Sequence, residues 1–164
     1  MRVFRIILLL TAALALSACG SKFRTYNGPA VTFVQVDKSA RKMYLLHDNT
    51  VLKDYDIALG FAPQGPKQFE NDGKTPEGLY FITRRNPNSR DHLSLGVSYP
   101  NETDMAFAQA EGKKTGGDIF IHGKSRFRGK NRGDWTWGCI AVKDREVEDI
   151  YAMVRDGTPI RINP

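Results

Sequence analysis

Short runs of alternating apolar and polar residues, separated by stretches rich in glycine, proline and asparagine, recur from residue 31 to residue 162. The run from Val31 to Val36 alternates in this way, which is the period of a strand with one buried face. Comparable strands are predicted at residues 43–46, 51–59, 79–83, 93–98, 118–122, 138–142 and 158–162. Residues 47–50 read as the turn of a hairpin. The pattern therefore predicts a mainly β domain.

Two segments have a helical pattern instead. Between residues 147 and 154 the apolar side chains recur at intervals of three and four, which predicts a helix from Asp144 to Arg155 with Asp144 as its N-cap and Gly157 as the stop. Residues 102–110 are predicted to form a second, short helix. The chain shows no internal repeat, and its loops at 61–66, 71–78 and 86–89 are each followed by renewed strand pattern. We therefore expect one domain with one or two short helices.

The first 18 residues are typical of an export signal. Arg2 and Arg5 precede an apolar run from Ile6 to Leu16. This run is shorter than the roughly 20 residues that a membrane-spanning helix needs, so it is not expected to remain as a transmembrane anchor. The rest of the chain is long enough for one core and short for two.

The sequence Leu16-Ser17-Ala18-Cys19-Gly20 resembles the bacterial lipobox. We therefore predict a lipoprotein signal peptide at residues 1–18, a lipidated tether at 19–29 that begins with the lipid on Cys19, and a catalytic domain at 30–163. Gly20 favours the outer membrane as the final location. The expected location is the cell envelope, lipid-anchored and facing the periplasm. A chance cysteine after an ordinary signal peptide is the alternative.

The charge balance suits an envelope protein better than a nucleic-acid-binding one. The chain has 24 Lys and Arg residues against 18 Asp and Glu residues, and the signal peptide holds two of the basic ones. Such a mild excess fits anionic lipid headgroups or wall peptides. We expect no nucleic-acid partner and a monomeric protein. The three histidines show no i, i+4 pairing and no phosphate-binding glycine loop is present, so no metal or cofactor is expected.

Candidate chemistry concentrates between His122 and Cys139. His122 ends an apolar strand and Cys139 begins another, and each has a glycine beside it. A thiol becomes a strong nucleophile when a neighbouring imidazole takes its proton. The alternative is a core histidine and a cysteine that acts as a small apolar residue. Together the two strand ends favour a Cys–His site.

Backbone groups beside these two residues are candidates for stabilising an oxyanion. The candidates are Gly123, which follows the histidine, and Trp137 and Gly138, which precede the cysteine. Glycine also leaves the imidazole and the thiol approachable. The local sequence thus predicts a nucleophile, a base and amide donors within two short segments.

The pairing of Ile121-His122-Gly123 with Thr136-Trp137-Gly138-Cys139-Ile140 resembles the catalytic signature of the L,D-transpeptidase domain family of bacterial cell-wall enzymes. Residues 74–82 are similar to that family's Thr-Pro-x-Gly-x-Tyr/Phe-x-Ile segment, and residues 157–160 to its usual close. The likeness extends over residues 29–163. Residues 85–89 and 98–101 resemble the branch that includes a murein hydrolase, which cleaves a lipoprotein from the wall.

The resemblance implies a compact β-sandwich with the site in a groove, Cys139 as the acylated nucleophile and His122 as its base. It implies attack on an L,D-amide of a peptidoglycan stem peptide, typically between diaminopimelate and D-alanine, which gives a thioester. An amine then completes a cross-link or protein attachment, and water completes hydrolysis. Three functions stay open: L,D-transpeptidase, hydrolase of the same bond (an L,D-carboxypeptidase or amidase), and wall-binding lipoprotein without turnover.

Two positions depart from the family pattern. Trp137 stands where many members have histidine, and Ala141 stands where many have an arginine that can hold a substrate carboxylate. A basic loop between the histidine and the cysteine offers a substitute, although a solvated connector is the alternative. The predicted substrate-binding residues are three from this loop and one from the segment shared with the hydrolase branch: Arg126, Arg128, Arg132 and Tyr99.

Overall fold

The structure, a computed structural model, describes residues 21–124 and 133–164. Within these residues the chain forms eight strands and two helices. They are β1 (Phe33–Asp37), β2 (Lys42–His47), β3 (Thr50–Asp56), β4 (Gly78–Asn86), β5 (Ser94–Val97), α2 (Glu102–Ala110), β6 (Phe120–His122), β7 (Ile140–Ala141), α3 (Asp144–Met153) and β8 (Pro159–Asn163). The predicted mainly β fold with one or two short helices is confirmed, and the number of helices in these residues is two.

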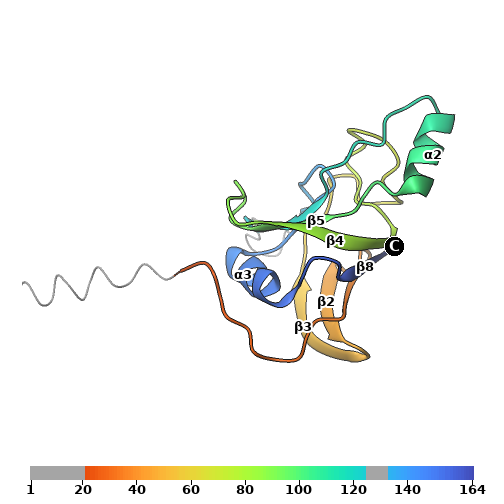
Figure 1. Cartoon of the computed structure of the whole chain (residues 1–164). Helices are drawn as coiled ribbons and strands as arrows, with labels where there is room; N and C mark the ends of the chain where they lie inside the picture. The colour runs from red at the N-terminus through yellow and green to blue at the C-terminus, as the bar shows by residue number, and fades with distance from the viewer. Residues whose placement is uncertain (1–20, 125–132) are drawn as a thin grey trace, which may run out of the picture.

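The strands form one curled sheet in the order β3-β2-β1-β8-β4-β5-β6-β7. The β1–β8 and β6–β7 pairs are parallel, whereas the other neighbours are antiparallel. Figure 1 shows β2 and β3 running across the direction of β4 and β5, so the two halves of the sheet enclose a common core. The curl places the short strands β6 and β7 at one end of the sheet.

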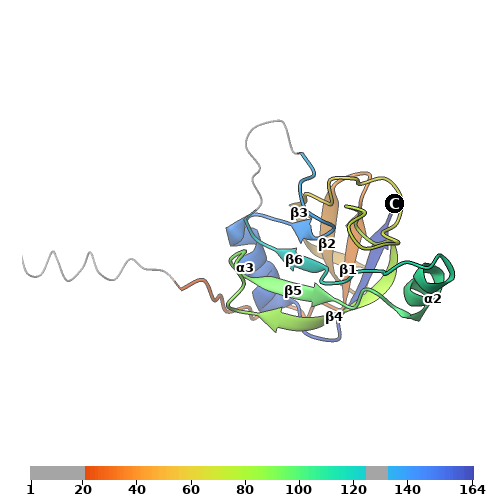
Figure 2. The same cartoon turned by 90° about the horizontal axis from the view of Figure 1, so that it is seen from above.

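The core is filled by the inward faces of both halves and by α3. Alternation buries Val34 and Val36 of β1 completely, and Ile121 and Ile140 are equally buried in β6 and β7. Ile150 of α3 also belongs to this cluster. Helix α2 lies on the other side of the molecule from α3 (Figures 1 and 2). Thus α3, and not α2, supports the strands that end at the predicted site.

The boundaries of α3 differ from the expected ones at both ends. Lys143, not Asp144, is the N-cap, because the Glu146 carboxylate accepts the Lys143 N–H at 2.9 Å. The Asp144 carboxylate instead accepts the N–H of Lys124 at 2.7 Å, which ties the helix to the end of β6. At the other end Val154 is already extended, so the helix ends at Met153.

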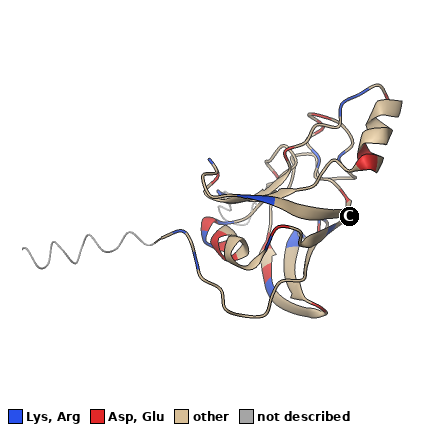
Figure 3. Ribbon diagram, in the orientation of Figure 1, with Lys and Arg blue, Asp and Glu red and all other residues tan. Residues whose placement is uncertain are grey.

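Residues 21–30 form no helix or strand, and they lie against the domain. The Arg24 guanidinium pairs with Glu148 and Asp149 of α3, each at 2.8 Å. The ring of Phe23 packs near Tyr151 of the same helix, with 6.2 Å between ring centroids. Figure 3 shows basic and acidic positions interspersed along the strands, whereas the charged positions of α2 are all acidic. No helix in the described part of the chain combines the length and apolar character needed to cross a membrane.

Candidate active site

Strands β6 and β7 bring His122 and Cys139 to one cavity. The parallel register pairs Ile121 with Ile140, so Cys139 lies level with Phe120. Because side chains alternate between the faces of a sheet, Phe120, His122 and Cys139 share the face opposite the two core isoleucines. All three line a cavity of about 330 Å³, together with residues of β4, β5 and the loop between them: Asn86, Ser89, Arg90, Asp91 and Ser94.

His122 is held as a neutral imidazole. Its ring is 5% exposed, and Nδ1 lies 2.7 Å from the carbonyl oxygen of Gly123. A carbonyl only accepts, so Nδ1 carries the proton and the lone pair of Nε2 is available. Burial lowers the pKa of His122 below its usual value, while the hydrogen bond to Gly123 and the nearby Asp91 carboxylate act in the opposite direction. Near neutral pH the imidazole is therefore uncharged.

The Cys139 thiol is protonated under the same conditions. Burial raises the pKa of Cys139 to about 11, although a hydrogen bond from the backbone of Phe120 favours the thiolate. The carboxylates of Asp91 and Asp118 raise the pKa further. The Sγ atom lies 3.5 Å from the carbonyl oxygen of Asp118. A thiol in this state needs a base to become a nucleophile, and the neutral His122 imidazole in the same cavity is the candidate for that base.

A tight turn presents the cysteine. Gly138 has a φ of +127°, and a Cβ atom there would lie 2.5 Å from the carbonyl oxygen of Lys74, so only glycine fits. The Thr136 hydroxyl accepts the Gly138 N–H at 3.1 Å and donates to the carbonyl oxygen of Cys139 at 2.7 Å. Thr136 thus fixes the turn from inside. Sequence reasoning included it in a motif without giving it this role.

The predicted oxyanion donors divide into engaged and free groups. The Gly123 N–H donates to the carbonyls of Asp91 and Leu93 at 3.0 and 3.3 Å. The Gly138 N–H is bound to Thr136. Within the described part of the chain, the Trp137 and Cys139 N–H groups have no acceptor. The indole of Trp137 is 66% exposed and meets the edge of Phe61 at a centroid distance of 4.9 Å.

Of the other predicted site residues, the structure describes Tyr99 and does not bring it to this cavity. Tyr99 is 5% exposed and packs against Tyr80, and its hydroxyl donates to the carbonyl of Thr115 at 3.2 Å, so it belongs to the core and not to the Cys139 cavity. Cys19 and the three loop arginines at 126, 128 and 132 lie outside the described residues. Ala141 is fully buried, and its backbone exchanges two hydrogen bonds of 2.9 Å with Ala58.

One wall of the Cys139 cavity was not predicted from the sequence. That wall comes from Asn86, Ser89, Arg90, Asp91 and Ser94, which lie at the end of β4, in the following loop and at the start of β5. Ser94 is opposite His122 in the ladder between β5 and β6. This pairing would have placed these residues beside His122, but it can be predicted only when the order of the strands in the sheet is known. The individual residues carry no local motif for catalysis.

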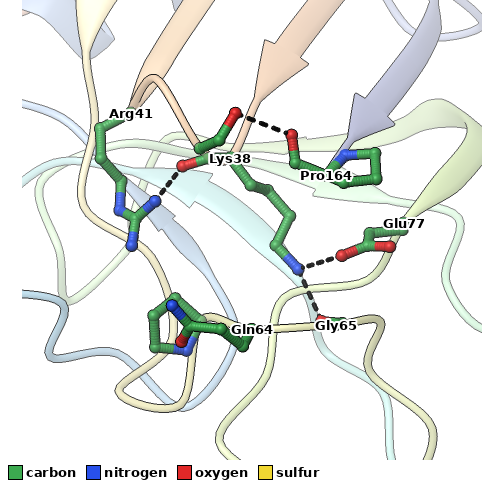
Figure 4. A pocket seen from close by; sticks show the side chains of 8 residues that line it. Lys38, Arg41, Gln64, Gly65, Glu77 and Pro164 are labelled. Carbon is green, nitrogen blue, oxygen red and sulfur yellow. Dashed lines mark hydrogen bonds and ion pairs between the residues drawn. The ribbon is translucent and has the colours of Figure 1, made fainter.

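A second cavity contains charges that are already paired. Figure 4 shows Lys38 inside it, with Nζ 2.7 Å from both the carbonyl oxygen of Gly65 and the carboxylate of Glu77. The same ammonium donates to the carbonyl of Thr75 at 3.1 Å. Burial lowers the pKa of Lys38, and the Glu77 carboxylate acts against this effect. These groups hold loops together and leave nothing for chemistry.

A third cavity, between residues 23–27 and α3, is lined by Arg24, Arg85 and Arg155. Arg24 is used by its two carboxylate partners on α3, and Arg85 both donates to the carbonyl of Tyr151 and stacks on that ring at 4.0 Å. Among the described residues no group of three or more His, Cys, Asp and Glu side chains is arranged to hold a metal ion. The Cys139 cavity is therefore the candidate active site.

Comparison with known proteins places this arrangement in a family. Residues 31–162 match the L,D-transpeptidase catalytic domain. The chain is 28% identical over 128 residues to the Escherichia coli protein named "Putative L,D-transpeptidase YafK". The match covers 74% of this chain and 46% of that protein. The chain thus spans less than half the length of the curated relatives it matches.

Solved structures show the same fold. Bd1075 of Bdellovibrio bacteriovorus is 26% identical with a TM-score of 0.59, over 81% of this chain and 48% of that one. The helical cell shape determining protein Pgp2 of Campylobacter jejuni is 25% identical with a TM-score of 0.61, over 91% and 53%. An L,D-transpeptidase of Mycobacterium smegmatis is 17% identical with a TM-score of 0.56, over 82% and 59%. Since the family match extends over most of the chain and contains both His122 and Cys139, this protein belongs to the L,D-transpeptidase catalytic domain family.

Proposed function

We propose that this protein is a cysteine L,D-transpeptidase that acts on peptidoglycan stem peptides through a thioester on Cys139. The observation that carries the proposal is a protonated thiol in the same cavity as an imidazole whose Nδ1 donates to the Gly123 carbonyl, which leaves Nε2 as the unprotonated nitrogen. The two side chains share one solvent-open cavity. The family membership supplies the substrate class.

In the first step Nε2 of His122 takes the thiol proton as Sγ attacks the carbonyl carbon of the amide. The C–N bond of the tetrahedral intermediate then breaks, and the imidazolium returns the proton to the leaving amine. The products are the thioester and a free amino acid or peptide. Because both groups start neutral, proton transfer accompanies attack and no stable ion pair precedes it.

In the second step an acceptor amine attacks the thioester carbonyl. His122 takes a proton from that amine and passes it to the departing sulfur, which restores the thiol. Water in place of the amine gives hydrolysis with the same proton balance. The free N–H groups of Trp137 and Cys139 are our candidates for binding the oxyanion in both steps.

We also propose that the protein is anchored in the cell envelope through a lipid on Cys19. The proposal rests on the lipobox-like sequence at residues 16–20. Replacing Cys19 with serine should abolish both lipid attachment and cleavage of the signal. A Cys19→Ser variant that is processed and retained by membranes like the parent protein would contradict the anchor.

The enzymatic proposal is tested by incubating the purified protein with disaccharide-tetrapeptide and separating the products. Cross-linked dimers with release of D-alanine indicate transfer, and disaccharide-tripeptide alone indicates hydrolysis. Cys139→Ala should give neither. A folded protein whose thiol reacts with a carbapenem but which converts no stem peptide would overturn the enzymatic proposal in favour of wall binding.

A further inference from the structure

Among the residues that the structure describes, one cation lines the Cys139 cavity and has no partner there. Arg90 is exposed at the cavity mouth, and it makes no hydrogen bond or ion pair with any other described residue. The other described side chains around the cavity are polar, aromatic or acidic. Asp91, its neighbour, has Lys124 at 3.8 Å as a weak partner. An unpaired guanidinium in the cavity that holds Cys139 is a candidate for bidentate hydrogen bonding to an anion.

The backbone that carries Arg90 is firmly held. Within the loop, Asn88 and Asp91 donate their N–H groups to the side chains of Asn86 and Ser89 at 2.9 and 3.1 Å. From β6, the Gly123 N–H binds the carbonyl of Asp91 at 3.0 Å. The side chain of Arg90 is therefore presented from a fixed platform, which reduces the entropy lost when a ligand binds.

The outer side of this loop is fastened by the N-terminal segment. The ammonium of Lys22 donates to the carbonyls of Pro87 at 2.6 Å and His92 at 3.2 Å, and thereby spans the loop that contains Arg90. His92 in turn contacts Glu148 of α3 at 2.8 Å, and Glu148 also binds Arg24. Lys22 and Arg24 precede residue 31, where the family match begins. This fastening is thus added to the family domain.

We propose that Arg90 binds a free carboxylate of the peptide that acylates Cys139, and that Lys22 is a positioning residue for Arg90. The inference rests on the proposed function for the identity of the peptide. The proposal assigns carboxylate recognition to Arg90, in the loop between β4 and β5. The prediction from the sequence was the arginines at 126, 128 and 132. The adjacent Asp91 makes the cavity unfavourable for a polyanion, so a single carboxylate is the chemistry that fits.

The first test needs no substrate. Alkylation of Cys139 by anionic iodoacetate and neutral iodoacetamide is compared at low salt, with peptide mass mapping to separate Cys139 from Cys19. Arg90→Gln should lower the iodoacetate-to-iodoacetamide rate ratio severalfold, and high salt should shrink the difference. Arg161→Gln, which removes an exposed arginine of β8, is the control and should leave the ratio unchanged. An unchanged ratio in Arg90→Gln overturns the proposal.

The second test uses stem tetrapeptides whose free carboxylates are intact or amidated. Arg90→Gln should raise KM for the free form about tenfold with kcat within about twofold, because a charge-assisted hydrogen bond made equally in ground and transition states is lost. The amidated donor should respond little. Equal KM changes for both donors would overturn carboxylate binding. A failed proposed function looks different, since no variant would turn over although the alkylation ratio still falls.

Lys22 is tested in a double-mutant cycle. Lys22→Met should weaken the discrimination between the two donors when Arg90 is present and have no effect in the Arg90→Gln background. Lys53→Met is the matched control, because Lys53 pairs with Asp149 of α3 at 2.7 Å and makes no contact with the loop. Additive effects of Lys22→Met and Arg90→Gln would overturn the positioning role.

Discussion

The Lys38 cavity and the Cys139 cavity are built from similar polar side chains, and they differ in how completely those side chains are paired. Lys38 is 3% exposed in its side chain and satisfies three acceptors. In the other cavity Arg90 has no partner among the described residues, and the acceptor of the Cys139 thiol is the Asp118 carbonyl oxygen at a long 3.5 Å. Buried polar groups cost free energy unless they are bonded. Full pairing therefore points to a structural role for the Lys38 cavity, and the less completely paired groups make the Cys139 cavity the candidate for binding a ligand.

The largest expected effect is a loss of kcat from a substitution in the Cys139 cavity. His122→Gln removes the base while keeping a polar side chain of similar reach, and should lower kcat about 10²- to 10⁴-fold. Steady-state rates with one tetrapeptide donor check this. His47→Gln is the control, since the His47 side chain is 42% exposed and its partners among the described residues are the carbonyl of Ala30 and the nearby Asp48. A loss below about threefold in His122→Gln would contradict the role of base.

In the Lys38 cavity, a substitution should lower the stability of the fold and not the catalytic rate. Lys38→Met leaves the Glu77 carboxylate, 18% exposed, without its cation, and should lower the free energy of unfolding by about 3–5 kcal/mol. Urea denaturation measures it. Lys42→Met breaks exposed pairs with Asp54 and Asp56 and should cost about 0–1 kcal/mol. If Lys38→Met stayed as stable as Lys42→Met, or lost activity in the folded fraction, the contrast between the cavities would fail.

Thr136 links stability to the site and should show an intermediate effect. Thr136→Val removes the acceptor of the Gly138 N–H and the donor to Cys139 at nearly constant shape, which should cost about 1–3 kcal/mol in unfolding free energy. We also expect lower kcat, because the cysteine turn loses its internal brace. Thr136→Ser keeps the hydroxyl and should retain both properties. Equal behaviour of the valine and serine variants would remove Thr136 from the account.

Asp91 should give the smallest effect, a shift in pH dependence. Its negative charge raises the pKa values of both His122 and Cys139. Asp91→Asn should therefore move the acid limb of the activity profile, set by deprotonation of His122 below its usual value near 6.5, to lower pH. It should also speed iodoacetamide alkylation of Cys139 at a fixed pH of about 8, because the thiolate fraction increases. Asp156→Asn, at an exposed carboxylate, is the control; identical profiles would exclude the charge effect.

The sequence predicted the fold well because strand alternation is a local property. Its errors occur where contacts distant in sequence decide. β4 continues through polar residues to Asn86 because β5 pairs with its end. The polar, exposed Arg84 gives no local signal that the strand continues past residue 83. β3 ends at Asp56, and residues 58–60 leave it to bridge Ala141 and Thr136 instead.

The site divides in the same way. His122 and Cys139 were identified from the sequence because both stand at strand ends beside glycine. Arg90 was not, because only the β5–β6 pairing brings its loop to Cys139. Tyr99 was assigned to the substrate from a local motif, and packing places it in the core with Tyr80. Local sequence thus predicts the candidate pair of His122 and Cys139, and the fold determines what surrounds it.

The central claim is that Cys139, activated by His122, forms a thioester with a stem peptide. Intact-protein mass spectrometry of the protein mixed with disaccharide-tetrapeptide tests it most directly. We predict an adduct with the mass of the donor less D-alanine, mapped to Cys139, labile to hydroxylamine and missing in Cys139→Ala. Stem-peptide turnover without such an adduct, or an adduct of the same mass that persists in Cys139→Ala, would contradict the account.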